Sequence, residues 1–271
     1  MLSRLDAAGV ALFALSYDPV ATLRAFADKH GIGYPLLSDE GSHVIRRLGL
    51  INERVQEDHA AYGIKPDPRH TNLPYPGVFV LDASGVIVAK RFHESYRERD
   101  GGAALLAQTL GLLEPDPDRA AGSSGELVVV NAWLDSSTYS FFQRLHAHVE
   151  LRMAPGVRVC SREARDGLVP LTVRVAEIPG VDVGDVLWPP AEPARVTGLD
   201  GLTPSHGGKL RGLVPLTFAA PPGAGNLTVE LAVGYQAWSD AGRLPPSSFT
   251  ARLAIEEVAM VERALPARPG A

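Results

Sequence analysis

The sequence predicts two domains of different classes, an α/β domain that is incomplete at its N-terminus and a following all-β sandwich. An apolar run at 10–17 has no helical spacing and is typical of a buried central strand. Helical and extended patterns then alternate as far as residue 112, whereas short alternating segments lie between Pro/Gly turns beyond residue 125. We therefore expect the α/β domain at 1–112, a linker at 113–125, the β domain at 126–260 and a tail at 261–271.

Composition excludes several classes of function. A formal net charge of −5 provides no basic surface for nucleic acid, and the longest apolar stretches are far shorter than the ~20 residues of a membrane helix. The one cysteine, Cys160, can form neither an internal disulfide nor a cysteine cluster for a metal, and we expect no cofactor. No export signal follows Met1, so we expect the chain as written to be cytoplasmic, with the localisation of a longer parent left open.

The start of the chain predicts that the first domain is incomplete. Only nine residues precede the run at 10–17, and residues 2–9 look like the last turns of a helix that Gly9 terminates. A parallel α/β sheet needs a further strand and crossover helix before such an element. We therefore expect that strand, and most of its helix, to lie outside this chain.

Two helices and an extended segment follow the first strand. Pro19 suits the first position of a helix that runs to Gly31, and 32–37 reads as a short strand or extended connection. The next helix has Val44, Ile45, Leu48 and Leu50 as its apolar stripe. Its start can be capped by any one of three side chains, those of Ser38, Asp39 and Ser42.

The rest of the first domain contains a loop, a hairpin and a closing helix. Residues 51–76 are polar and rich in Pro, His and Asp, which predicts a surface loop. Strands at 77–82 and 86–92 flank the turn Ala83-Ser84-Gly85, and 99–112 reads as the last helix. The dense charge run at 91–100 is interpreted as a solvated rim.

Three segments in the right order carry a family resemblance. They are Ser16-Tyr17-Asp18-Pro19 with Phe26 to His30, Tyr34 to Asp39, and Pro76 to Ile87. Together they resemble the peroxiredoxin family of alkyl hydroperoxide reductase and thiol-specific antioxidant proteins over residues 2–112. The resemblance implies a thioredoxin-like fold that has lost its first strand and the helix bearing the active site.

The same resemblance implies peroxide chemistry at a cysteine that this chain does not contain. In the family that cysteine opens the first long helix, where the helix N-terminus and nearby positive charge stabilise its thiolate. It would lie upstream of Met1, and residues 1–112 contain no cysteine, so no catalytic residue can be assigned. The resemblance also implies that Pro76 is the cis-proline placed beside the active site, although most X–Pro bonds are trans.

The second domain is predicted from its strands. They are expected at 127–134, 145–153, 169–176, 214–218, 227–235 and 253–258. The stretch from Gly234 to Pro246, with Pro155 to Val159 and Leu187 to Pro190, resembles the N-terminal, immunoglobulin-like domain of the disulfide-interchange protein DsbD. Trp238 and Arg243 occupy the positions of its two redox cysteines, so the scaffold is expected without its dithiol.

Two further candidate sites are weak. Cys160 lies between Arg158 and Arg162, which could lower a thiol pKa, but a lone cysteine is more often a small buried residue. His146 and His148 share one face of a presumed strand, but no third ligand is spaced with them, so we expect no metal site.

Three interpretations of function follow. The first is a peroxiredoxin-like thiol oxidoreductase whose catalytic segment is missing, with a thiol reductant or redox protein as partner. The second is a non-enzymatic protein-binding module derived from such an enzyme. The third concerns the origin of the chain: a selenocysteine codon read as a stop would leave an open reading frame that resumes at an internal methionine. We favour the third for the origin and the first for the full-length parent, inactive as written; the oligomeric state stays open.

Overall fold

The computed structural model describes two compact units, which lie within residues 1–99 and 100–259. The described residues are 2–61, 65, 73–92, 99–100, 106, 110–111, 120–123, 125–163, 167–219 and 223–258. The predicted tail at 261–271 lies outside them, as do most residues of the predicted helix at 99–112 and of the linker. At the start of that predicted helix, Arg99–Asp100 form a short strand, β5.

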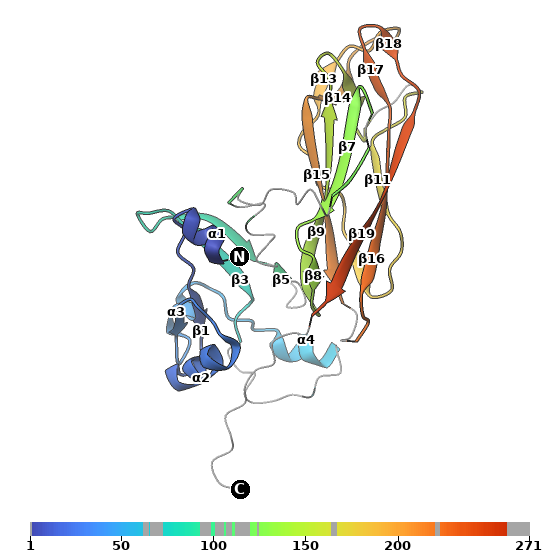
Figure 1. Cartoon of the computed structure of the whole chain (residues 1–271). Coiled ribbons are helices and arrows are strands. Elements are labelled where there is room, and N and C mark those ends of the chain that lie inside the picture. Colours follow the sequence, from blue (N-terminus) through green and yellow to red (C-terminus); the bar gives the residue numbers. More distant parts are fainter. Residues whose placement is uncertain are drawn as a thin grey trace. The chain divides into compact units, whose positions relative to one another are not determined.

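The first unit follows the predicted order of elements as far as α3 and again at the β3-β4 hairpin (Figure 1). Its elements are α1 (Leu2–Ala7), β1 (Ala14–Ser16), α2 (Val20–His30), β2 (Leu36–Ser38), α3 (His43–Arg47), α4 (Val55–Ala61), β3 (Gly77–Leu81) and β4 (Ile87–Phe92). β1 pairs in parallel with β2, and β3 pairs antiparallel with β4. Within the described part of this unit, the strands thus form two separate two-stranded sheets.

The run at 10–17 is not the buried central strand that we expected. Only Ala14–Ser16 form a strand, and the side chains of Phe13 and Leu15 are 58% and 42% exposed. The reason is that, among the described residues, β2 is the one strand that pairs with β1. Within the described residues, this sheet has two strands, and a sheet this small provides few neighbouring side chains to cover an apolar run.

Local hydrogen bonds explain where the helices of the first unit begin and end. Gly31 ends α2 in the left-handed conformation, with φ of 59°. The Asp39 carboxylate accepts the backbone N–H groups of Val44 (3.0 Å) and Ile45 (2.8 Å) at the start of α3. Asp39 is therefore the cap among the three candidates.

One helix lies where a loop was predicted. α4 begins shortly after Asn52, whose side-chain oxygen accepts the backbone N–H of Arg54 (2.9 Å). Asn52 and Val55 are both buried, so a local side-chain hydrogen bond and one buried apolar side chain outweigh the polar composition of this stretch.

The predicted hairpin is confirmed, but the predicted cis-proline is wrong. At the turn between β3 and β4, the Asp82 carboxylate accepts the N–H groups of Ser84 (2.9 Å) and Val86 (3.0 Å). None of the described peptide bonds is cis, so the bond before Pro76 is trans. Trans is the favoured isomer, and Tyr75 is held by a hydrogen bond from its N–H to the Leu50 carbonyl (2.8 Å).

The second unit consists of strands, and the predicted strands are confirmed. They are β6 (Ala121–Gly122), β7 (Val128–Leu134), β8 (Thr138–Tyr139), β9 (Gln143–Met153), β10 (Arg158–Cys160), β11 (Thr172–Val175), β12 (Val181–Val183), β13 (Glu192–Ala194), β14 (Thr203–Gly207), β15 (Lys209–Phe218), β16 (Leu227–Tyr235), β17 (Ala237–Ser239), β18 (Gly242–Arg243) and β19 (Ser247–Glu257). β6 lies in the predicted linker and pairs with β7, so this part of the linker is an edge strand.

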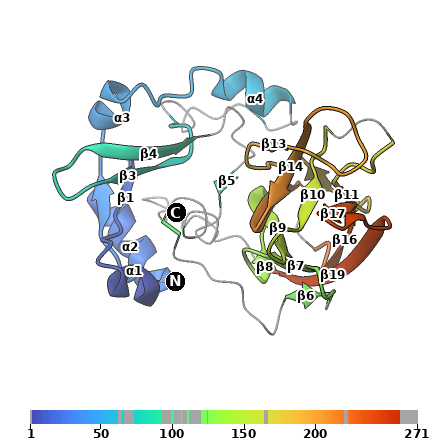
Figure 2. The ribbon, with the colours of Figure 1, turned by 90° about the horizontal axis from the view of Figure 1, so that it is seen from above.

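Two of the sheets share one apolar core. The sheet β12-β15-β9-β7-β6 and the sheet β11-β16-β19-β8 both send side chains into it. Alternation decides which face is inside: Leu145, Ala147, Val149 and Leu151 of β9 face this core, whereas the residues between them face the other way. A third sheet, β13-β14-β10-β17-β18, lies at one end of the unit (Figures 1 and 2).

Candidate functional site

The third sheet brings the two predicted redox positions together. Trp238 of β17 and Arg243 of β18 are direct cross-strand partners. Because the N–H of Leu244 bonds to the carbonyl of Ala237 (2.9 Å), the next pair along, Trp238 and Arg243, is a non-hydrogen-bonded pair. The Cα atoms of such pairs are about 4.5 Å apart, within the range that a disulfide spans. Two cysteines at these positions would thus be suitably placed, but neither residue carries a thiol.

Trp238 instead belongs to a buried apolar cluster beside the third sheet. This residue is 3% exposed and packs in a small cluster with Cys160, Leu168 and Val196, whereas Arg243 is exposed. A large apolar side chain therefore stands where a redox centre would need solvent and partner access.

Cys160 lies beside this pair but is not a reactive thiol. It belongs to β10, which pairs with β17, and its N–H bonds to the carbonyl of Gln236 (3.0 Å). The side chain is fully buried, and this burial raises the pKa of its thiol to about 11. The thiol is therefore protonated at neutral pH and lacks the thiolate that nucleophilic or redox chemistry requires.

His146 and His148 share a face of one strand, as predicted, and both rings contact neighbouring side chains. His146 Nδ1 lies 3.2 Å from the Asp135 carboxylate, and His148 stacks on Trp133 with ring centroids 5.0 Å apart. Among the described residues, no group of three or more potential ligands could hold a metal. Burial, followed by the nearby Arg211 charge, lowers the pKa of His148 to about 3, so this ring stays neutral.

The same face holds a buried carboxylate that sequence reasoning missed. Glu150 is 1% exposed and accepts hydrogen bonds from Arg152 (2.6 Å) and Arg211 (2.8 Å), with Lys209 3.3 Å away. Burial raises the pKa of Glu150, but these three cations outweigh it and hold the value below the usual range. The alternating pattern His146-x-His148-x-Glu150 was the signal that these side chains share one face.

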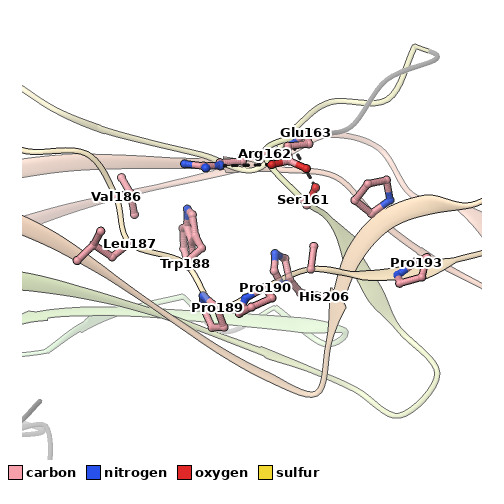
Figure 3. A pocket seen from close by; sticks show the side chains of 12 residues that line it. Ser161, Arg162, Glu163, Val186, Leu187, Trp188, Pro189, Pro190, Pro193 and His206 are labelled. Carbon is pink, nitrogen blue, oxygen red and sulfur yellow. Dashed lines mark hydrogen bonds and ion pairs between the residues drawn. The ribbon is translucent and has the colours of Figure 1, made fainter. Parts of the chain in front are cut away.

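A pocket of about 530 Å³ lies between the third sheet and the segment after β12 (Figure 3). Its apolar wall includes Trp188, Pro189 and Pro190, and its polar lining includes Ser161 and His206. Figure 3 shows Ser161 to Glu163 along one side of the pocket and the segment from Val186 to Pro190 along the other. The side chains of Trp188 and His206 lie between these two segments. The sequence suggested the Trp188 segment only as part of a family resemblance and not as a pocket.

A family model matches the first part of the chain. Residues 1–90 match the AhpC/TSA family, which confirms the predicted resemblance for that part and implies a thioredoxin-like fold there. A search of the curated proteins finds no match. In the part of the chain that the structure describes, no helix is long and apolar enough to cross a membrane.

Three solved structures are similar to parts of this chain. The N-terminal periplasmic domain of ScsB from Proteus mirabilis is 17% identical with a TM-score of 0.35, and the match covers 52% of this chain and 49% of that one. This chain therefore spans about half the length of the ScsB structure.

The second is the N-terminal domain of Neisseria meningitidis DsbD in its reduced form, 12% identical with a TM-score of 0.30, covering 53% of this chain and 91% of that one. The GAE domain of yeast GGA1 is 10% identical with a TM-score of 0.27, covering 48% and 95%. The predicted resemblance to DsbD thus appears among the similar structures, but TM-scores this low do not establish a shared fold.

Proposed function

We propose that this chain is part of a peroxiredoxin-like thiol oxidoreductase whose catalytic cysteine or selenocysteine is supplied by a strand and helix outside residues 1–99. The match of residues 1–90 to the AhpC/TSA family supports the chemistry. The substrate class is a peroxide or a disulfide, and the partner is a thiol reductant or a redox protein.

The observation that carries this proposal is a set of exposed apolar side chains among the described residues of the first unit. Phe13, Leu15, Leu37, Leu81, Ile87 and Val88 on or beside its four strands are each at least 42% exposed. Parallel and mixed sheets of α/β proteins normally bury both faces under helices and pair their central strands on both edges. An additional strand and helix would join the two small sheets and cover these side chains.

Residues 1–271 cannot reduce a peroxide by themselves. Peroxide reduction needs a thiolate or selenolate that attacks the peroxide oxygen, and the chain has only the buried, protonated Cys160. We therefore expect the chain as written to be inactive, while the longer product is active.

The test compares two proteins in a hydrogen peroxide consumption assay with a dithiol reductant. One is residues 1–271, and the other is the product of the same gene with about 40–60 additional upstream codons, the length of the missing half of a βαβ unit. We expect turnover in the longer protein alone. Turnover by residues 1–271 that Cys160→Ser abolishes, or an in-frame stop other than UGA close before Met1, would contradict the proposal.

A second candidate function, a non-enzymatic binding module, is favoured by the third sheet. There the two redox positions hold a buried Trp238 and an exposed Arg243, so that site is a scaffold without a dithiol. We propose an immunoglobulin-like sandwich for this unit, which its two large sheets around one core support. An inactive longer protein would favour this second function over the first.

A further inference from the structure

We propose that the pocket beside Trp188 binds an uncharged aromatic ring that carries one hydroxyl group, as in a free phenol or a tyrosine side chain. We call it the Trp188 pocket; its key residues are Ser161, Trp188, Pro189, Pro190 and His206. A volume of about 530 Å³ falls in the range of small-ligand sites, ~300–1,000 Å³. This inference goes beyond the proposed redox function and does not depend on it.

The aromatic wall of the pocket is held in place before any ligand binds. Leu187 makes backbone hydrogen bonds in both directions with Leu213 of β15 (2.8 and 3.1 Å), which ties the segment to the large sheet. The ring of Trp188 lies so close to Gly212 that a Cβ atom at this position would overlap it. A ring that is fixed in this way offers a preorganised flat surface, and it loses little freedom when a second ring stacks on it.

The polar groups of the pocket suit a hydroxyl. Ser161 is buried, and its hydroxyl accepts the N–H of Glu163 (3.1 Å), which leaves its own proton for a ligand. Burial, followed by the charge of Arg158, lowers the pKa of His206, so its ring is neutral and has one donor and one acceptor nitrogen. The described residues make no hydrogen bond to this ring. A phenolic hydroxyl can both donate and accept, and it can therefore satisfy these two groups together.

The charges around the pocket favour a neutral ligand. The charge of Arg158 is engaged by Glu192, with nitrogen and oxygen 3.1 Å apart. At the mouth, Arg162 and Glu163 lie 4.0 Å from each other and compensate one another. A charged ligand would lose its hydration without gaining an unpaired partner of opposite charge, which is unfavourable.

The experiment uses the indole N–H signals of the whole chain in a ¹⁵N NMR spectrum. The protein has three tryptophans, of which Trp133 and Trp238 are buried, and Trp188→Phe identifies the signal of the pocket. We expect p-cresol to move the Trp188 signal saturably and to leave the other two in place. We expect 4-methylcyclohexanol, with the same hydroxyl on a non-aromatic ring, and toluene, without the hydroxyl, to bind at least about tenfold more weakly.

Variants and a second probe complete the test. His206→Leu should weaken p-cresol binding about tenfold, whereas His43→Leu, at an exposed position of the first unit, should not change it. N-acetyltyrosinamide tests the source: affinity at least equal to that of p-cresol indicates a polypeptide ligand, and weaker binding indicates a free phenol.

Four results would overturn the proposal. The first is that no signal moves up to the solubility limit of p-cresol, and the second is that all three indole signals move together. The third is that 4-methylcyclohexanol binds as well as p-cresol. The fourth is that His206→Leu has no effect while the Trp133 and Trp238 signals show a folded protein.

Discussion

Restoring two cysteines at the third sheet tests both its register and the resemblance that pointed to it. In the double variant Trp238→Cys with Arg243→Cys, the two thiols face each other across a non-hydrogen-bonded pair. The resulting bridge closes a loop of six residues, for which the loss of chain entropy in the unfolded state predicts a stabilisation of about 2 kcal/mol. Removing the buried Trp238 ring costs about 3 kcal/mol, but in the oxidised and the reduced protein alike.

The assay therefore compares the two redox forms of one variant. Urea unfolding should show a midpoint about 1 M higher for the oxidised form than for the reduced form. The number of free thiols should fall from three to one on mild oxidation, because Cys160 remains. In the matched control, Ser239→Cys with Arg243→Cys, the side chains point to opposite faces of the hairpin and should stay reduced.

A folded double variant that keeps all three thiols under the same oxidation would refute the reasoning. The pairing of Trp238 with Arg243 would then be wrong in solution. The assignment of this hairpin to the redox loop of a DsbD-like domain would be wrong with it.

Three further predictions concern stability and surface. Glu150→Gln should lower the free energy of unfolding by about 2 kcal/mol at pH 7, because hydrogen bonds from three partly exposed cations lose their charged partner. The pKa of Glu150 is lower in the folded protein than its ordinary value of 4.5. Its contribution to the free energy of unfolding is therefore present above pH 4.5 and is lost as the pH falls through the pKa of the folded protein. Urea unfolding in acid should consequently give the same stability for wild type and variant. Gly212→Ala should cost about 1–3 kcal/mol in urea unfolding and move the Trp188 indole signal, since the added methyl group displaces that ring; an unchanged spectrum would contradict the described packing. The intact chain should bind a hydrophobic dye, and the double variant Phe13→Ser with Val88→Ser should reduce the dye fluorescence. Each single change should alter the free energy of unfolding by less than about 0.5 kcal/mol. Equal fluorescence of variant and wild type would show that these side chains are covered in solution.

The order and type of most elements follow from local pattern. Gly31 and the turn at 83–85 mark helix and hairpin ends through fixed backbone preferences, and these positions agree with the structure. Pro19, predicted at the first helical position, lies one residue before it, at the N-cap of α2. The alternating segments of the second unit likewise become strands, because a period of two residues buries one face. Local signals also suffice to name Asp39 among the caps, but not to choose it over Ser38 or Ser42.

Two elements of the first unit differ from the prediction because local composition did not decide them. The composition of the sequence made 51–76 a loop, yet a cap from Asn52 and the burial of Val55 start α4 there. The central strand expected at 10–17 is short and exposed, since a strand is buried by its neighbours and not by its own sequence.

The sequence by itself determined that the chain has one cysteine, Cys160, and that Trp238 and Arg243 are the residues at the positions where the resemblance to DsbD predicts a dithiol. Only the tertiary structure decided that Cys160 is buried and protonated, that Glu150 collects three cations, and that Trp188 and His206 line a common pocket. The physical reason is that exposure, pKa and pocket shape are set by side chains that lie far apart in the sequence and meet only when the strands pair and pack.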